Sequence, residues 1–320
     1  MAGDATQKRV LLLGATGTAG RAAGAALLAA DYQVVTFGRS APDLPGIEGR
    51  IGDLSDPASV SRDGLRGEAF DAVISCLASR TGAAADAWAI DYVANLNVMH
   101  AAAQAGVRQF VYMSAICVQK PKLAFQRAKL AMEEALASSG MVYSIVRPTA
   151  FFKSLSGQVA RVQQGRPFMV FGNGELTACK PISDRDLADY MVRCLTDDVL
   201  QNAVLPIGGP GPAVTPLDQA AILGRLLGRE VPVRRVPAGL MPAIATGLSV
   251  AGMVSAKAKE KADLARIGHY YGTQSMLLWD GERYNADATP EFGGDTLKTH
   301  YERIFLGEID AALGLHSVFD

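Results

Sequence analysis

The chain has 320 residues, with 31 Lys and Arg against 32 Asp and Glu, and a formal net charge of −1 at pH 7. This length can bury a sizeable core, as one large domain or as two unequal lobes. The balanced charge, with no basic tract and no acidic tail, argues against nucleic-acid binding and against disorder. Four cysteines lie far apart without a C-x-x-C pair, so we expect reduced, buried thiols and no metal site.

The sequence carries no strong targeting or membrane signal. Residues 1–7 are short and polar, which predicts a cytoplasmic protein without a leader. No run reaches the roughly 18 apolar residues of a membrane span, although peripheral contact with a membrane is left open. The nearest run, 238–254, is interrupted by a proline and three glycines and is followed by a lysine cluster at 257–261. We expect it to wall or cover a substrate cleft, with an ordinary core helix as the alternative; its apolar residues at helical spacing are Leu240, Ile244 and Leu248.

Short apolar strands alternate with helices along the first half of the chain. Such alternation predicts an α/β fold with a doubly wound parallel sheet, and right-handed crossovers between its strands. We therefore expect a Rossmann-type dinucleotide-binding domain over residues 1–150. Strands are expected at 8–13, 33–38, 46–52, 71–78, 108–116 and 141–147, and helices at 18–30, 86–104 and 123–138.

The pattern changes after Pro148. Residues 168–180 contain Gly172-Asn173-Gly174 between two extended runs, which predicts a β-hairpin. Ser183 is expected to cap a helix over 184–195, and Thr215-Pro216 to start another. Residues 151–320 should form mainly a smaller mixed α/β substrate lobe, with some segments returning to the Rossmann sheet.

A glycine-rich turn follows the first strand and opens the first helix. Gly14, Gly17 and Gly20 form a G-x-x-G-x-x-G pattern. Glycines let the backbone approach a pyrophosphate, and the helix N-terminus offers free N–H groups and a positive dipole end. We expect this turn, including Thr16 and Thr18, to bind a dinucleotide.

The residues after the second strand predict NADPH rather than NADH. An NAD site would place Asp or Glu there, to bind the ribose 2′-hydroxyl. This chain has Gly38-Arg39, which suits a 2′-phosphate, and Arg21 adds a second positive charge. Other expected cofactor contacts are Asp53 and Leu54 at the adenine, Cys76, Leu77 and Ala78 beneath the ribose, and Pro148 after the sixth strand.

The string FQRAK at 125–129 stands where a short-chain dehydrogenase carries Tyr-x-x-x-Lys. We expect Lys129 to bind the nicotinamide ribose, and Ser114 takes the place of the serine that polarises the substrate. Phe125, however, lacks the phenol that protonates a developing oxyanion in carbonyl reduction. The pattern therefore points away from alcohol and ketone chemistry.

Longer strings between 74 and 189 are more specific: SCLASRTG, SAICVQKP, FQRAKL, YSIVRPTAFFKSLSGQ and CKPISDRDLAD. They resemble the NADPH-dependent 3,8-divinyl chlorophyllide 8-vinyl reductases, a branch of the atypical short-chain dehydrogenases with an NmrA-like domain. The resemblance extends over 10–195 and resumes at 267–278 and 289–305. It implies that the substrate is a tetrapyrrole, a divinyl chlorophyllide or protochlorophyllide, whose 8-vinyl group is reduced to ethyl in chlorophyll or bacteriochlorophyll biosynthesis.

The missing phenol agrees with that chemistry. Hydride delivered to the terminal vinyl carbon leaves negative charge on the adjacent carbon, where the macrocycle delocalises it and no oxyanion forms. A proton must still reach the inner carbon, and the sequence leaves Tyr112, Lys153, Lys180 and water as unranked donors. We expect apolar walls for the pigment, with core packing as the alternative; the candidates are Phe125, Phe151, Phe152 and Phe168, together with Tyr270, Tyr271 and His269 of the second lobe.

Two other functions compete. One is an NADPH-dependent alkene reductase of the isoflavone or phenylcoumaran type, which would share the glycine turn and the lysine but not the longer strings. The other is a redox sensor that binds NADP and catalyses nothing. The absence of a tyrosine at position 125 suggests this alternative.

Overall fold

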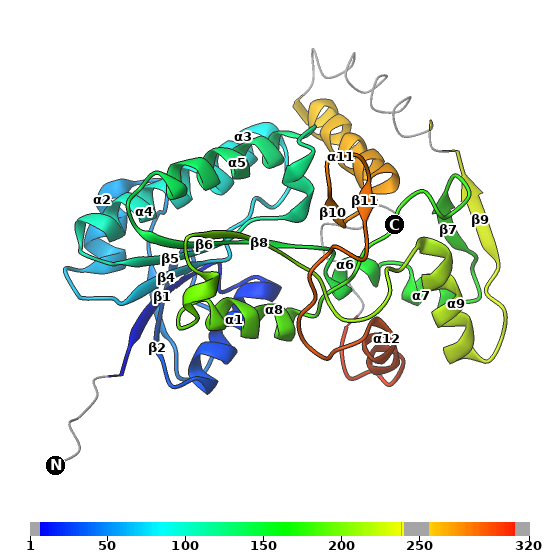
Figure 1. Cartoon of the computed structure of the whole chain (residues 1–320), viewed down its shortest axis with the longest axis horizontal. Helices are drawn as coiled ribbons and strands as arrows, with labels where there is room; N and C mark the ends of the chain where they lie inside the picture. The colour runs from blue at the N-terminus through cyan, green and yellow to red at the C-terminus, as the bar shows by residue number, and fades with distance from the viewer. Residues whose placement is uncertain (1–6, 238, 240–255, 311–320) are drawn as a thin grey trace.

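The computed structural model describes residues 7–237, 239 and 256–310, and the side chains of all of these except 256–260. Figure 1 shows a large sheet flanked by helices, which forms one end of the molecule, and a smaller mixed lobe at the other end. Leu240, Ile244 and Leu248 fall outside the described residues, so the expected cleft wall there stays a prediction. Among the helices that the structure describes, none is both long and apolar enough to cross a membrane.

The main sheet has seven strands in the order β3-β2-β1-β4-β5-β6-β8, and all its pairings are parallel. From β1 the chain builds outward to β2 and β3, and then returns to add β4 on the other side. The carboxyl ends of β1 and β4 therefore flank the crevice where open α/β sheets bind ligands. The strands are β1 (Arg9–Leu13), β2 (Gln33–Gly38), β3 (Glu48–Ile51), β4 (Ala72–Ser75), β5 (Gln109–Met113), β6 (Val142–Pro148) and β8 (Ala203–Ile207).

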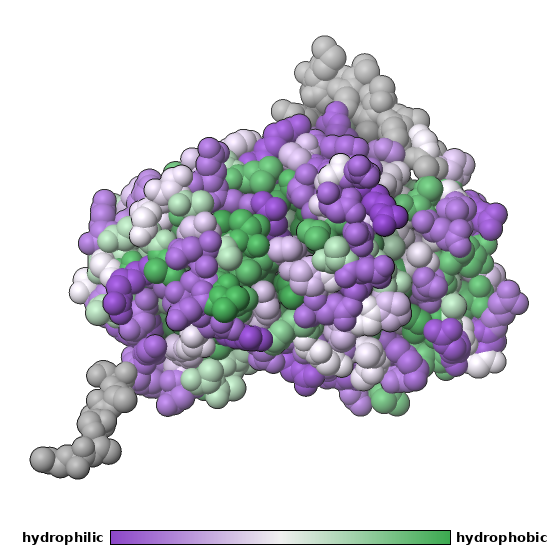
Figure 2. All heavy atoms as spheres, in the orientation of Figure 1, coloured by the Kyte–Doolittle hydropathy of each residue, from purple (hydrophilic) through white to green (hydrophobic). Residues whose placement is uncertain are grey.

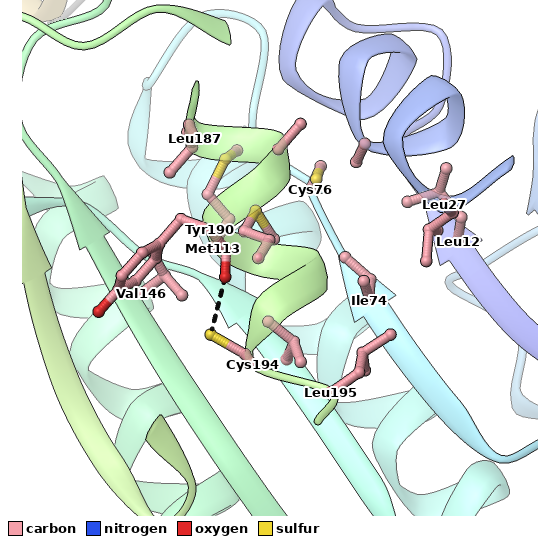
Figure 3. Close-up of a cluster of buried hydrophobic side chains, with 14 of the residues drawn as sticks. Leu12, Leu27, Ile74, Cys76, Met113, Val146, Leu187, Tyr190, Cys194 and Leu195 are labelled. Carbon is pink, nitrogen blue, oxygen red and sulfur yellow. Dashed lines mark hydrogen bonds between the residues drawn. The ribbon is translucent and has the colours of Figure 1, made fainter. Parts of the chain in front are cut away.

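Helices cover both faces of this sheet (Figure 1). On one face lie α1 (Thr18–Ala29) and α8 (Asp184–Arg193), which bury a cluster that includes Leu12, Leu27 and Ile74 (Figure 3). In that cluster the Cys194 thiol donates to the Tyr190 carbonyl oxygen at 3.3 Å. The other face carries α3 (Ala84–Ala87), α4 (Asn95–Gln104) and α5 (Ala124–Ala137), and its core is a second apolar cluster. The short elements α2 (Pro57–Ser59), η1 (Val60–Leu65), η3 (Ile116–Gln119) and η4 (Asp198–Leu200) lie in the connections.

Most of the predicted elements are confirmed. β2 has the predicted bounds, 33–38, and α1 begins at Thr18 as expected. Ser183 caps α8 by accepting from the Asp186 N–H, and Thr215 caps α9 (Pro216–Leu227) in a capping box with proline in its first turn. The long helix expected over 86–104 is a continuous helical run, but its middle part, η2 (Trp88–Ala94), is a π-helix.

The predicted hairpin over 168–180 is wrong. β7 (Phe168–Phe171) pairs in parallel with β9 (Val233–Val236), a strand more than 60 residues further along the chain. The turn exists, because Gly172 and Gly174 have φ of 60° and 88° and the Gly174 N–H donates to the Phe171 carbonyl. Inward-facing apolar residues of β7 pack on α9, however, and this tertiary packing sets the strand's partner.

The smaller lobe has its own core, in which Phe152, Leu223 and Tyr301 are buried. Its remaining elements are α6 (Phe152–Leu155), α7 (Val159–Gln163), α11 (Ala256–Thr273), β10 (Leu278–Trp279), β11 (Tyr284–Asn285) and α12 (Leu297–Phe305). β8 and α8 also follow residue 150 in the chain, yet they belong to the sheet and to its helical cover. Figure 2 shows a largely polar face with apolar residues gathered near its centre, in the region of the edge strand β8 in Figure 1, where Val204 is 44% exposed.

Candidate active site

The glycine turn is shaped by close backbone approaches. Gly14 has φ +75°, and a Cβ there would lie 2.6 Å from the carbonyl oxygen of Cys76 at the end of β4. A Cβ on Gly20 would lie 2.2 Å from the Gly14 oxygen, so α1 can pack on the turn only with glycine at that position. Gly17 is less constrained. A Cβ on Gly17 would lie 3.4 Å from its nearest neighbour, the Gly14 oxygen, and the residue is exposed. The open side of the turn is therefore at Gly17.

The N-terminus of α1 has unused hydrogen-bond donors. Gly17 is its N-cap, with no side-chain cap, and no acidic residue lies in the first turn. Thr16 and Thr18 are exposed beside it, and the Arg21 guanidinium donates to the Thr16 carbonyl at 3.2 Å. Free N–H groups and an uncompensated positive dipole end suit a phosphate. This geometry fits a dinucleotide pyrophosphate.

A lysine from the segment after β6 reaches the same place. The Lys153 ammonium donates to the Thr18 hydroxyl at 3.2 Å, although the two residues are 135 positions apart in sequence. Lys153 also counteracts the rise that burial produces in the pKa of Asp184, at the start of α8. A cation at a helix N-terminus opposes the helix dipole. An anion bound there would remove this conflict.

Arg39 and Asp53 lie together beyond the ends of β2 and β3. Both side chains are exposed, and a Cβ on Gly38 would meet nothing within 4 Å. Hydrogen bonds from the Ser55 hydroxyl and N–H, with Arg39 as a smaller influence, hold the pKa of Asp53 below its usual value. Leu54, next along the chain, is buried.

The residues after β4 and β6 present backbone to the crevice. The Cys76 side chain is buried and points into the core between the sheet and α1 with α8 (Figure 3). Only its backbone meets the glycine turn, and Leu77 and Ala78 become progressively more exposed. Pro148 is buried as the last residue of β6.

A buried ion pair holds Lys129. Its ammonium lies 3.2 Å from an Asp91 carboxylate oxygen, and the two side chains are 6% and 1% exposed. The ammonium also donates to the Met113 carbonyl at 3.3 Å, and the Tyr112 hydroxyl donates to the Asp91 backbone oxygen at 3.3 Å. Burial alone would lower the pKa of Lys129, but Tyr112 and Asp91 outweigh it and raise that pKa. The lysine is therefore a fixed cation at the carboxyl edge of β5.

Asp91 was not predicted from the sequence. It lies in η2, and π-helical segments inside α-helices occur frequently at functional sites. An isolated Asp in an apolar helical pattern has no spacing that marks it as the partner of a lysine 38 residues later. The one feature of the sequence that could have indicated a buried role for Asp91 is its apolar surroundings in the string WAIDYVA.

Ser114 is engaged with a second buried acid. Its hydroxyl donates to Glu133, which also forms an ion pair with Arg147 from β6. The hydroxyl proton is thus committed to a carboxylate, and a substrate could meet Ser114 only through its oxygen or after that bond breaks. Glu133, like Asp91, was not predicted.

Phe125 lies at the boundary between the two lobes. It packs against a small apolar cluster that contains Cys117 and Tyr270, with Ile267 beside it. The Tyr270 hydroxyl donates to the Cys117 carbonyl at 2.9 Å, which fastens α11 to the loop after β5. The neighbouring Tyr271 is 45% exposed.

The remaining aromatic candidates are not gathered at one surface. Phe152 and Phe168 are 3% and 2% exposed and form part of the second lobe's core, which agrees with the core-packing alternative to a pigment wall. Phe151 packs on the opposite cluster, between the sheet and α8. The Nδ1 of His269 is buried without a hydrogen-bond partner among the described residues.

The fold and the glycine turn define a dinucleotide-binding protein. A protein-family model described as NAD(P)H-binding matches residues 14–198. A solved structure of an NADPH-dependent quinone oxidoreductase from Escherichia coli, complexed with NADPH, shares the fold with a TM-score of 0.66; it is 21% identical and covers 92% of this chain and 99% of its own.

Sequence similarity to curated proteins is higher and narrows the class. The chain is 42% identical to the chloroplastic divinyl chlorophyllide a 8-vinyl-reductase of Zea mays, over 98% of this chain and 84% of that protein. It is 47% identical to the Cucumis sativus protein of the same name, over 86% of this chain and 65% of that protein. The chain belongs to the family of divinyl chlorophyllide a 8-vinyl-reductases.

Proposed function

We propose that this protein reduces the 8-vinyl group of a divinyl chlorophyllide or protochlorophyllide to an ethyl group with NADPH, in chlorophyll or bacteriochlorophyll biosynthesis. The observation that carries the proposal is the 42% identity to the Zea mays reductase over nearly the whole chain. The site supports it, because a fixed cation at Lys129 lies beside a phenylalanine at 125 in place of a carbonyl-protonating phenol.

The geometry of the site supports the following cofactor roles. The turn at Gly14, Gly17 and Gly20, with Thr16 and Thr18, would receive the pyrophosphate, and Lys153 would add a cation to it. Arg39, with Arg21, would favour the 2′-phosphate of NADPH, which supplies the hydride when bound. Lys129, held by Asp91, would bind the nicotinamide ribose. Asp53, Leu54, Leu77 and Ala78 would line the adenosine and ribose side.

The test is product analysis after incubation of the protein with NADPH and each of two pigments, divinyl chlorophyllide and divinyl protochlorophyllide. Conversion of either to its 8-ethyl product, resolved by chromatography, supports the proposal, and the comparison of rates identifies the preferred pigment. Binding of NADPH without conversion of either pigment would favour the redox sensor instead. Conversion of an isoflavone but neither pigment would favour the isoflavone-type alkene reductase.

A further inference from the structure

We propose that Tyr271 is the acid of this site: its hydroxyl donates the proton to the inner carbon of the reduced vinyl group. The inference rests on the proposed function and supplies the donor that the phenylalanine at 125 cannot be. A phenol would then act at this site after all, but it would come from the second lobe instead of α5.

The position of α11 carries the inference. Two hydrogen bonds from the Tyr270 hydroxyl, to the carbonyls of Cys117 at 2.9 Å and Lys120 at 3.2 Å, fix this helix on the loop after β5. Ile267, one turn earlier, packs on the same apolar cluster, and a Cβ on Gly82 would lie 2.9 Å from its Cδ1. The helix is therefore held against the carboxyl edge of β4 and β5, where the nicotinamide of a dinucleotide fold is bound.

Tyr271 projects from this helix towards the fixed cation. Its ring stands edge-on to Tyr270 with centroids 5.7 Å apart. After burial, Cys117 and the carboxylate of Asp91, which binds Lys129, are among the groups that raise the pKa of Tyr271. The residue as a whole is 45% exposed, so a substrate can contact its ring. Burial of the hydroxyl raises the pKa of Tyr271 well above 10, which keeps the proton in place until it is needed.

The other sequence candidates are less suitable. Tyr112, within β5, is fully buried, and its hydroxyl donates to the Asp91 carbonyl oxygen. Lys180 is bound to Glu291 in an ion pair. Lys153 is at the Thr18 hydroxyl, beside the phosphate turn. Among these candidates, Tyr271 alone is a phenol on a partly exposed residue of the anchored helix.

The step balances as follows. NADPH supplies a hydride to the terminal vinyl carbon and is oxidised to NADP⁺, while the carbon–carbon double bond becomes a single bond. The electron pair left on the inner carbon takes the proton from the Tyr271 oxygen. Water then returns a proton to the Tyr271 phenolate. Carbanions are in general stronger bases than phenolates, so the transfer from the Tyr271 phenol to this carbon is downhill.

The test compares Tyr271→Phe with Tyr270→Phe and the wild-type protein, in single-turnover reduction of divinyl chlorophyllide. Tyr271→Phe should slow the turnover by about 10²–10⁴-fold, the usual contribution of a positioned general acid. The dissociation constants of NADPH and of the pigment should be unchanged. Tyr270→Phe loses the two hydrogen bonds that dock α11, so it measures how much rate is lost through displacement of the helix alone; it should lower the Tm and slow the turnover much less than Tyr271→Phe does.

Four outcomes would contradict the proposals. A wild-type protein that leaves both pigments unreduced would refute the proposed function itself. A wild-type protein that reduces the pigment while Tyr271→Phe keeps its single-turnover rate would overturn the inference and leave water as the donor. Equal losses of rate in the two variants would also overturn it, because displacement of α11 would then explain both. In D₂O the wild-type product should carry one solvent deuterium, on the inner carbon; deuterium on the terminal carbon would contradict the assigned order of hydride and proton.

Discussion

Replacing Gly17 with alanine should weaken NADPH binding without harming the fold, whereas the same change at Gly20 should damage both. The two glycines lie in one motif and look equivalent in the sequence. In the structure a new Cβ at position 17 would lie 3.4 Å from its nearest neighbour, while at position 20 it would lie 2.2 Å from a backbone oxygen.

The expected magnitudes follow from these distances. At Gly17, loss of a good N-cap should lower the free energy of unfolding by a few tenths of a kcal/mol or somewhat more. Alanine also restricts the unfolded chain, which should raise that free energy by about 0.4–1 kcal/mol. The net change should therefore stay within about 1 kcal/mol. At Gly20 the turn and α1 must separate by about 1 Å, and such overpacking costs about 1–3 kcal/mol. The methyl group at 17 would hold a phosphate away from the N–H groups, which should cost about 1.5–3 kcal/mol of binding, or a tenfold to hundredfold rise in Kd.

The assay pairs thermal unfolding with titration of NADPH fluorescence. Gly17→Ala should melt within a few degrees of wild type, since 1 kcal/mol shifts the Tm of a domain of this size by about 2–4 °C. Gly20→Ala should melt clearly lower. If Gly17→Ala bound NADPH as tightly as wild type, the pyrophosphate could not lie on this turn, and the reasoning from its open side would be refuted.

Four further predictions follow. Arg39→Ala should raise the Kd of NADPH roughly tenfold to a hundredfold with little change for NADH, by fluorescence titration; equal affinity of the wild type for both cofactors would contradict it. Asp91→Ala should lower the free energy of unfolding by about 3–5 kcal/mol, since it leaves a buried ammonium unpaired, whereas removal of the exposed ion-pair residue in Arg185→Ala should cost at most about 1 kcal/mol in the same denaturant titration. Lys153→Gln should weaken binding of NADPH and of ADP-ribose alike, and should do so less as salt rises. His300, whose pKa burial lowers to about 4, should make the Tm fall as pH drops from about 6.5 towards 4, because the unfolded chain takes up a proton that the folded chain refuses; His300→Gln should flatten the slope between pH 6.5 and 5.

Local patterns were sufficient where one rule governs a position. The bounds of β2, the start of α1 and the Ser183 cap all follow from apolar runs, a glycine turn and capping residues. The prediction of a hairpin at 168–180 was wrong although the predicted turn exists. Packing of β7 on α9 determines which strand pairs with it. The role of Asp91 could not be predicted for a related reason: it depends on Lys129, which only the tertiary fold brings next to it.

The positions of the aromatic residues in the fold also could not be predicted from the sequence. Phe151 and Phe152 are adjacent in sequence, yet they enter two different cores, because successive residues at the start of α6 face opposite ways. Tyr271, more than 140 residues from Phe125 in the sequence, is a partly exposed aromatic residue on the helix that is anchored to the loop after β5. The motif on one helix therefore shows that the acid at position 125 is missing. It does not show whether a residue of the other lobe supplies the proton instead. Substitution at 271, and not restoration of tyrosine at 125, is the change that should alter proton transfer.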